Sequence, residues 1–233
     1  MQRYSDTLKA AEIKALVGDS PVILEIGSNE GVDTQRFLDA MPGCRVWCFE
    51  PDPRPIARWR ERIKDPRASL IEAAICDKDG MAMFHGSSGT TPGGRQSPDV
   101  YCPVDDWDLS GSLLAPTGHL DYSRWVTFPA VAHVPVKTLR LDTWALESGF
   151  AAAHPDGIDF IWCDVQGAEH LVIEGGRWVL SNTRWFYTEF SNKEMYAGQK
   201  NLAELESMLS EAFVLEACYA NNALFHNHSK TQP

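Results

Sequence analysis

Two glycines and two acidic residues are the first part of this sequence whose spacing indicates chemistry. The segment Glu25-Ile-Gly-Ser-Asn-Glu-Gly31 follows a short apolar run, and a helical pattern of apolar residues begins after it. Gly27 and Gly31 would let the backbone turn tightly against a ligand, and the helix would offer free N–H groups. Glu50 ends the next apolar run, where a carboxylate can accept both hydroxyls of a ribose. This spacing favours a nucleoside ligand.

A nicotinamide-dinucleotide site is the nearest alternative. Its G-x-G-x-x-G pattern would require glycines at positions 27, 29 and 32, and the chain has Asn29 and Val32 at two of them. A strand-to-helix turn without any ligand is a second alternative. We favour the nucleoside because Glu50 follows at the expected distance.

The elements that must position these residues alternate between strand and helix. Apolar runs predict strands at 22–26, 45–50, 69–75, 81–85, 134–139, 158–164, 184–190, 214–219 and 223–226. Helical spacing predicts helices at 4–17, 31–40, 53–63, 168–180 and 201–212, and a short one from 141. Asp79-Gly80 predicts a hairpin turn. The pattern is typical of an α/β, Rossmann-like, doubly wound, mostly parallel seven-stranded sheet with a C-terminal antiparallel hairpin strand.

Residues 86–133 interrupt this alternation. Long irregular segments in compact domains are usually functional lids or disordered inserts, and disordered segments are poor in aromatic residues. This one contains Tyr101, Trp107, Tyr122, Trp125 and Phe128. We therefore predict a single domain over residues 1–233 in which 86–133 is an ordered lid or substrate-recognition insertion.

Composition excludes several classes of partner. The 233 residues are 44% hydrophobic and 23% charged, and the net charge is 21 − 32 = −11. Counterion-release binding to nucleic acid and docking on anionic lipid both need clustered cations. No apolar stretch approaches a membrane span, the N-terminus lacks a signal-type apolar region, and the six cysteines form no Cys-x-x-Cys pair. We expect a cytoplasmic protein with reduced thiols that binds neither nucleic acid nor membrane; an oligomer is possible.

Two blocks of the chain resemble a known family. Residues 25–31 look like motif I of class I S-adenosylmethionine-dependent methyltransferases, and Ile158-Asp-Phe-Ile-Trp-Cys-Asp-Val-Gln-Gly-Ala-Glu169 is similar to the signature of the FkbM-like members. Thr138-Leu-Arg-Leu-Asp142 resembles another element of that family. The chain differs at Trp162, where the family usually has lysine, and at Gln166, where glutamate is common.

The resemblance implies which residues contact S-adenosylmethionine. Glu25 and the loop of Gly27, Ser28, Asn29 and Gly31 would hold its methionine portion. Glu50 would bind the ribose, and Ala74, with Ile75 and Cys76, would border the adenine. Pro51, Asp164 and Val165 complete the predicted cofactor contacts.

The resemblance also implies methyl transfer to a hydroxyl of a sugar, glycan or polyketide-like small molecule. The donor is already activated, so the protein positions the reactants and removes a proton. Asp164, at a strand end, is our first candidate for the catalytic base, and Glu189 is the second. Glu169 is the third, although an acid opening a helix is also structurally favourable. Asp164 with Glu189 could bind a divalent cation, which is the less favoured alternative.

Histidines and aromatic residues supply further candidates. His85, His119, His133 and His170 lie near the predicted mouth and could act as bases, although a structural role is favoured for each. Trp107, Tyr122 and Trp125 could stack on a ring or pack within the insertion. Two other functions stay open at this point: an NAD-dependent oxidoreductase, and a non-catalytic binding module on the same fold.

Overall fold

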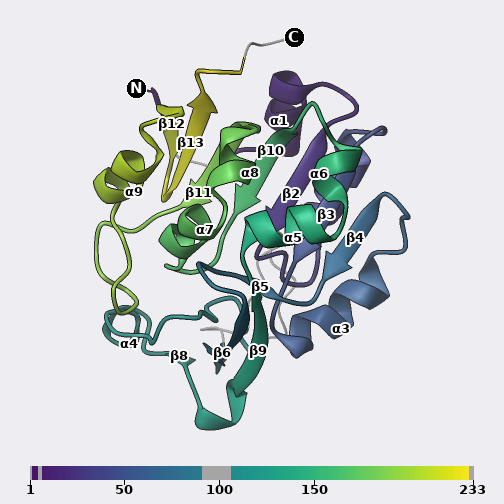
Figure 1. The fold of residues 1–233 in the computed structure, drawn as a ribbon. Coiled ribbons are helices and arrows are strands. Elements are labelled where there is room, and N and C mark those ends of the chain that lie inside the picture. The colour runs from purple at the N-terminus through teal and green to yellow at the C-terminus, as the bar shows by residue number, and fades with distance from the viewer. Residues whose placement is uncertain (1, 5–6, 91–105, 231–233) are drawn as a thin grey trace.

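A central twisted sheet organises the computed structural model, which describes residues 2–4, 7–90 and 106–230 (Figure 1). Its strand order is β1-β12-β13-β11-β10-β2-β3-β4, and only β13 runs antiparallel to its neighbours. The strands are β1 (Gln2–Tyr4), β2 (Val22–Ile26), β3 (Arg45–Phe49), β4 (Ala68–Ile71), β10 (Ile158–Cys163), β11 (Thr183–Glu189), β12 (Phe213–Tyr219) and β13 (Asn222–Asn227). The predicted fold class and C-terminal hairpin are confirmed, and the three-residue β1 extends the predicted seven strands to eight.

Helices cover both faces because successive side chains of a strand point to opposite sides. Ile23 belongs to a core with α1 (Ala10–Val17), α2 (Val32–Ala40) and α3 (Pro53–Arg62). Leu24 belongs to the opposite core, which the remaining main helices cover: α5 (Leu141–Glu147), α6 (Phe150–Ala153), α7 (Glu169–Gly175), α8 (Arg177–Ser181) and α9 (Leu202–Leu209). The carboxyl ends of the parallel strands therefore open at one edge between the layers.

The predicted strand 69–75 is wrong in its extent and partners. It divides into β4 and β5 (Ala74–Ile75), and β5 leaves the central sheet to pair with β9 (His133–Leu139). The predicted hairpin at Asp79-Gly80 is also wrong, because β6 (Gly80–His85) pairs antiparallel with β9. The resulting small sheet has the order β5-β9-β6. Its pairings join segments far apart in the chain, which a local turn pattern does not reveal.

Two predicted helices differ from the observed ones. The first helix is predicted at 4–17 but begins at Ala10, where the Glu12 carboxylate accepts the N–H of Lys9. Residues 5–6, at the start of the predicted range, lie outside the described residues. The predicted helix 168–180 breaks at Gly176 into α7 and α8. Trp178, just after the break, is 45% exposed.

The described parts of the insertion, residues 86–90 and 106–133, are built around buried polar residues. They contain β7 (Ser88–Gly89) paired with β8 (Val126–Thr127), helix α4 (His119–Tyr122) and a 3₁₀ turn, Ala130–Ala132. Trp107 packs edge-on against Trp125, with ring centroids 4.8 Å apart. Tyr101 lies outside the described residues.

Two further expectations concern the thiols and the membrane. Five of the six cysteines are free and buried, as predicted, and Cys102 falls in the segment that the structure leaves out. Within the described ranges, no helix combines the length and apolar character that crossing a membrane requires.

Candidate active site

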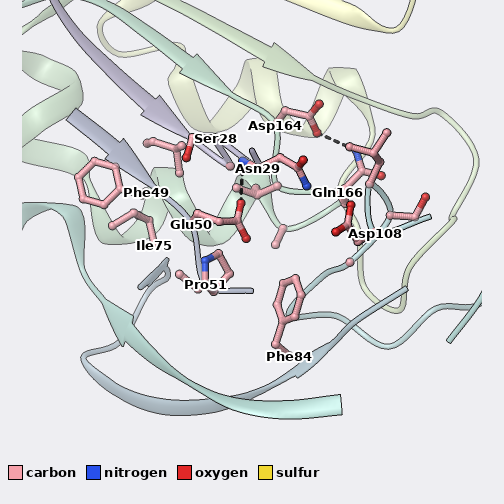
Figure 2. Close-up of a pocket in the computed structure, with 18 of the residues that line it drawn as sticks. Ser28, Asn29, Phe49, Glu50, Pro51, Ile75, Phe84, Asp108, Asp164 and Gln166 are labelled. Carbon is pink, nitrogen blue, oxygen red and sulfur yellow. Dashed lines mark hydrogen bonds between the residues drawn. The ribbon is translucent and has the colours of Figure 1, made fainter. Parts of the chain in front are cut away.

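A cavity of about 430 Å³ opens at the carboxyl ends of β2, β3 and β10 (Figure 2). Open parallel sheets bind their ligands at this edge. Ten of the predicted cofactor-binding and catalytic residues line it: Gly27, Ser28, Asn29, Glu50, Pro51, Ala74, Ile75, Asp164, Val165 and Glu189. Four others do not line it: Glu25, Gly31, Cys76 and Glu169. Most of the predicted residues therefore meet at one cavity.

The two glycines of the loop are required by packing within the protein. Gly27 has φ 89°, and a Cβ there would lie 1.8 Å from the carbonyl oxygen of Asp164. Gly31 has φ 81°, and a Cβ there would lie 2.7 Å from the Trp59 ring. Asn29 also adopts positive φ, and its side chain accepts a hydrogen bond from the Glu30 N–H. These contacts bring the ends of β2 and β10 together around the cavity.

Glu25 lies beneath the loop and not at the cavity wall. Its carboxyl accepts the Thr34 hydroxyl of α2 at 2.5 Å and the Cys48 thiol of β3 at 3.4 Å. Burial raises its pKa to about 8. This placement does not support the predicted direct contact between Glu25 and the cofactor.

Glu50 ends β3 with its carboxyl at the cavity wall. One oxygen accepts the N–H of Asn29 and the other accepts the N–H of Asp52, both at 2.8 Å (Figure 2). A carboxylate oxygen can accept a further hydrogen bond, so both remain able to accept a ligand hydroxyl. Burial raises the pKa of Glu50 to about 8.

One polar atom and one apolar wall of the cavity suit a nucleoside with an amino-acid portion. The Ser28 hydroxyl is buried and has no hydrogen-bond partner among the described residues, although buried polar groups are normally paired. Phe49, Ile75 and Phe84 form an apolar wall at the other side. The sequence did not single out Phe84, because its strand joins the wall through the β9 pairing. Cys76, predicted at this wall, does not line the cavity.

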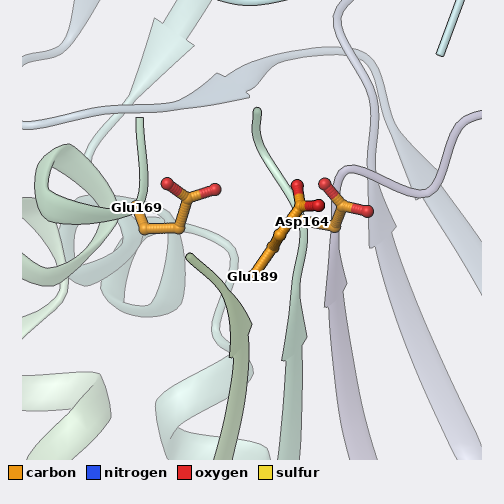
Figure 3. Close-up of side chains that lie close together, drawn as sticks. All are labelled: Asp164, Glu169 and Glu189. Atoms are coloured by element: carbon orange, nitrogen blue, oxygen red, sulfur yellow. The ribbon is translucent and has the colours of Figure 1, made fainter. Parts of the chain in front are cut away.

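Three acidic residues gather where β10 and β11 end (Figure 3). One carboxylate oxygen from each of Asp164, Glu169 and Glu189 lies within 4.8 Å of the others. The side-chain amide of Gln166 donates to Asp164 at 2.7 Å and to Glu189 at 2.8 Å. Burial raises the pKa of Asp164, and burial together with the Asp164 charge raises the pKa of Glu189 well above its usual value. Neighbouring carboxyls of this kind titrate as a pair, because the charge on one disfavours the charge on the other.

Glu169 has a structural contact at the start of α7. Its carboxyl accepts the N–H groups of Val165 at 3.3 Å and Gly167 at 3.2 Å. Burial raises its pKa to about 7. Glu169 thus has the structural role of an acid at the start of a helix, which was the alternative to a catalytic role. Asp164 and Glu189 line the cavity.

Helix α3 joins the glycine loop to the insertion, which sequence analysis missed. Arg58 forms ion pairs with Glu30 of the loop, at 2.8 Å, and with the buried Asp108 of the insertion. Arg54, one turn earlier, pairs with Asp106 at 3.1 Å. The four-residue spacing of the arginines was a visible signal, but their partners lie about fifty residues away.

The candidate histidines have mostly structural surroundings. His85 and His133 pack edge-on against each other, with centroids 4.8 Å apart. None of the four candidate histidines lines the first cavity. His119 lines a second, neighbouring cavity. Burial lowers the pKa of His119 and of His170, so the neutral ring is favoured in both.

Comparisons with known proteins agree with this geometry. Residues 25–216 match the family described as the methyltransferase FkbM domain. The 2-O-methyltransferase NoeI of Sinorhizobium fredii (strain NBRC 101917 / NGR234) is 42% identical to the chain over 198 residues, which cover 84% of this chain and 74% of that protein. The fold, the cavity and these matches define a methyltransferase.

More specifically, the chain belongs to the FkbM methyltransferase family. The predicted family and enzyme class are confirmed. The alternatives of an NAD-dependent oxidoreductase and of a non-catalytic binding module are set aside.

Solved structures resemble the chain at the level of the fold. A putative rRNA-methylase from Clostridium thermocellum has a TM-score of 0.50 and 9% identity, covering 97% of this chain and 99% of that one. The methyltransferase FkbM from Methylobacillus flagellatus KT has a TM-score of 0.48 and 12% identity, covering 89% of this chain. The alignment spans 44% of the length of that second protein.

Proposed function

We propose that this methyltransferase transfers a methyl group from S-adenosylmethionine to a hydroxyl of a sugar, glycan or polyketide-like small molecule. The observation that carries the proposal is the Asp164–Glu189 pair at the wall of a cavity whose other wall holds Glu50. The name of NoeI, a 2-O-methyltransferase, supports an oxygen acceptor.

The residues of the first cavity fit the cofactor. S-adenosylmethionine supplies a methyl group on a positively charged sulfur, so the chain itself needs only to bind, orient and deprotonate. The unpaired Ser28 hydroxyl would bind the methionine portion, and Glu50 would accept the ribose hydroxyls. Phe49 and Ile75 would contact the adenine. The nearby acids would favour the positive charge of the sulfonium.

The Asp164–Glu189 pair would receive the proton. Methyl transfer would break the sulfur–methyl bond of S-adenosylmethionine and form an oxygen–carbon bond on the acceptor, leaving S-adenosylhomocysteine. The hydroxyl proton is released in this step, and a base within hydrogen-bond reach must accept it. Burial raises the pKa of both carboxyls, which makes the pair a stronger proton acceptor than an exposed carboxylate. The amide of Gln166 orients both carboxyls toward a common point.

We propose that transfer proceeds without a divalent cation. Hard cations bind between carboxylate oxygens, and the amide nitrogen of Gln166 lies between Asp164 and Glu189, donating to both. Glu169, the third acid, accepts two backbone N–H groups. These contacts support a reaction in which no cation bridges the acids.

The wider predictions belong to the same proposal. We propose one domain over residues 1–233 in which 86–133 recognises substrate, supported by Trp107 and Asp108 at the cavity wall. We place the reaction in the cytoplasm, since free buried thiols suit a reducing compartment.

Thermal unfolding with S-adenosylhomocysteine or NAD tests the proposal. A ligand at 100 times its Kd stabilises the folded state by about 2.7 kcal/mol, so we expect S-adenosylhomocysteine to raise Tm by roughly 5 °C or more and NAD to leave it unchanged. Glu50→Gln should weaken this shift, while Glu216→Gln, an exposed acid on β12, should not.

The rate of methyl transfer in the presence of EDTA tests the metal-free reaction, and we expect it to equal the rate without EDTA. A shift with NAD alone would contradict the cofactor, and loss of activity in EDTA would contradict the metal-free reaction.

A further inference from the structure

A second cavity of about 420 Å³ adjoins the first. Its walls come from α4 of the insertion, the start of α7, and the loop 190–199 after β11. Gln166 and Glu189 line both cavities. Its volume falls within the range of small-molecule sites. One of its wall residues, Glu189, belongs to the carboxyl pair that we propose as the catalytic base.

The shared wall is held by hydrogen bonds from three distant segments. The Tyr196 hydroxyl donates to the Ser110 carbonyl at 2.8 Å and lies 3.3 Å from the side-chain oxygen of Gln166. The amide of Gln166 in turn donates to Glu189. Because Gln166 and Glu189 line both cavities, a molecule in the second cavity would reach Glu189 where the two cavities adjoin.

His119 supplies an unsatisfied hydrogen-bonding group in this second cavity. The side chain is nine-tenths buried, and its Nδ1 has no hydrogen-bond partner within the part of the chain that the structure describes. Burial lowers its pKa, so the ring is neutral and has one donor and one acceptor nitrogen. An alcohol can both donate and accept a hydrogen bond, so it can pair with either nitrogen of a neutral imidazole.

The rest of the lining suits a neutral polyhydroxylated ring. Asn192, Gln199 and Asn221 contribute amides, which both donate and accept. Tyr122 and Tyr196 contribute aromatic surface that the C–H face of a sugar can cover. The lining has one lysine, Lys193, whose Nζ lies 5.9 Å from the Tyr122 ring centroid, and two acids, Glu169 and Glu189. Burial raises the pKa of both acids and so disfavours their charged forms. Such a lining offers many hydrogen bonds and little net charge.

We propose that the second cavity binds the acceptor as a neutral saccharide, with the reacting hydroxyl at Glu189 and a second hydroxyl at His119. This inference rests on the proposed function, because the first cavity must hold the methyl donor. It selects saccharides from the broader class of hydroxyl acceptors and assigns their binding to α4 and the 190–199 loop.

Filling the second cavity tests the assignment. Ser123 ends α4, lines the second cavity and does not line the first. Ser123→Trp should therefore exclude a saccharide and leave the cofactor site intact. Ser207→Trp, on the exposed face of α9, is the matched control. Binding of a panel of methyl glycosides to the full chain saturated with S-adenosylhomocysteine is measured by saturation-transfer NMR, and S-adenosylhomocysteine affinity by calorimetry.

We expect wild type and Ser207→Trp to bind at least one glycoside, and Ser123→Trp to bind it at least tenfold more weakly with S-adenosylhomocysteine affinity within twofold of wild type. Equal glycoside binding by Ser123→Trp, or no glycoside binding by wild type, would overturn this inference and leave the proposed cofactor site standing. Failure of wild type to bind S-adenosylhomocysteine would overturn both.

A smaller change separates recognition from cavity shape. His119→Ala should raise KM for the bound glycoside about tenfold with kcat within threefold, because it removes one hydrogen-bonding partner remote from the reacting atoms. His228→Ala, an exposed histidine near the C-terminus, should change neither constant. An unchanged KM in His119→Ala would remove His119 from the saccharide site.

Discussion

Gln166 determines how two buried carboxyl groups share one site. Burial raises the pKa of both Asp164 and Glu189, and the Asp164 charge adds to the rise at Glu189. The Gln166 amide donates to both carboxyls and aligns them toward the cavity. Gln166 therefore adds a neutral hydrogen-bond donor to a site that holds three acids.

Asp164→Asn tests the base at this scale. Asparagine has the same shape and can still accept from Gln166, but it cannot take up a proton. We expect kcat to fall by about 100-fold or more, with S-adenosylhomocysteine affinity changed only a few-fold. The exposed Asp156→Asn should behave as wild type. Turnover at the wild-type rate in Asp164→Asn would assign the proton to another group.

Glu25 should make the stability of the protein depend on pH. In the folded protein its pKa is about 8, against 4.5 for an unperturbed glutamate. Between these values the unfolded chain has released a proton that the folded chain keeps, so the free energy of unfolding falls as the pH rises. Glu25→Gln keeps an acceptor for the Thr34 hydroxyl and removes the contribution of Glu25 to this pH dependence.

Urea unfolding at pH 5.5 and pH 8 measures the effect. Wild type should lose more stability between the two pH values than Glu25→Gln does, and the exposed Glu211→Gln should match wild type. The same pH dependence in wild type and Glu25→Gln would show that Glu25 does not hold a proton in the folded state.

At the scale of elements, helix α3 connects the glycine loop with the insertion. Its arginines sit one turn apart and contact Glu30 on one side and Asp106 and Asp108 on the other. The Asp108 side chain is fully buried, so its ion pair is screened less than a surface pair. The two walls of the first cavity should therefore become ordered together.

Two arginines of this helix give a matched comparison. Arg58→Ala removes a cation from the buried Asp108 and should lower the free energy of unfolding by about 3 kcal/mol. Arg60→Ala removes an exposed pair with Glu72 and should cost about 0.5 kcal/mol or less. Urea unfolding of both variants measures the difference. Equal losses would mean that the Asp108 contact does not hold the insertion in place.

Elements were predictable from sequence where local pattern decides them. Apolar runs located β2 and β10 to within a residue, and the positions of Gly27 and Glu50 followed from those strands. The local sequence pattern did not predict features that depend on contacts between distant segments. β5 follows β4 closely but pairs with β9, about sixty residues later, and the break at Gly176 lies inside an uninterrupted apolar pattern.

On the scale of the whole molecule, the cofactor edge was predictable and the second cavity was not. The edge follows from strand alternation, because every parallel strand delivers its carboxyl end to the same side. The second cavity instead depends on Gln166, Ser110 and Tyr196 meeting from three segments. The local sequence around these three residues does not predict that they contact one another.

The hydrogen bond between Ser110 and Tyr196 has a consequence for the order in which substrates bind. Ser110 lines the first cavity, and its carbonyl holds a residue that walls the second. We expect a ligand in the first cavity to position Tyr196 through Ser110, and therefore compulsory-order kinetics with S-adenosylmethionine binding first.

In steady-state measurements, a non-reactive acceptor analogue should then be an uncompetitive inhibitor with respect to S-adenosylmethionine. S-adenosylhomocysteine should be a competitive inhibitor with respect to S-adenosylmethionine. Competitive or mixed inhibition by the acceptor analogue would instead indicate that the two substrates bind in either order.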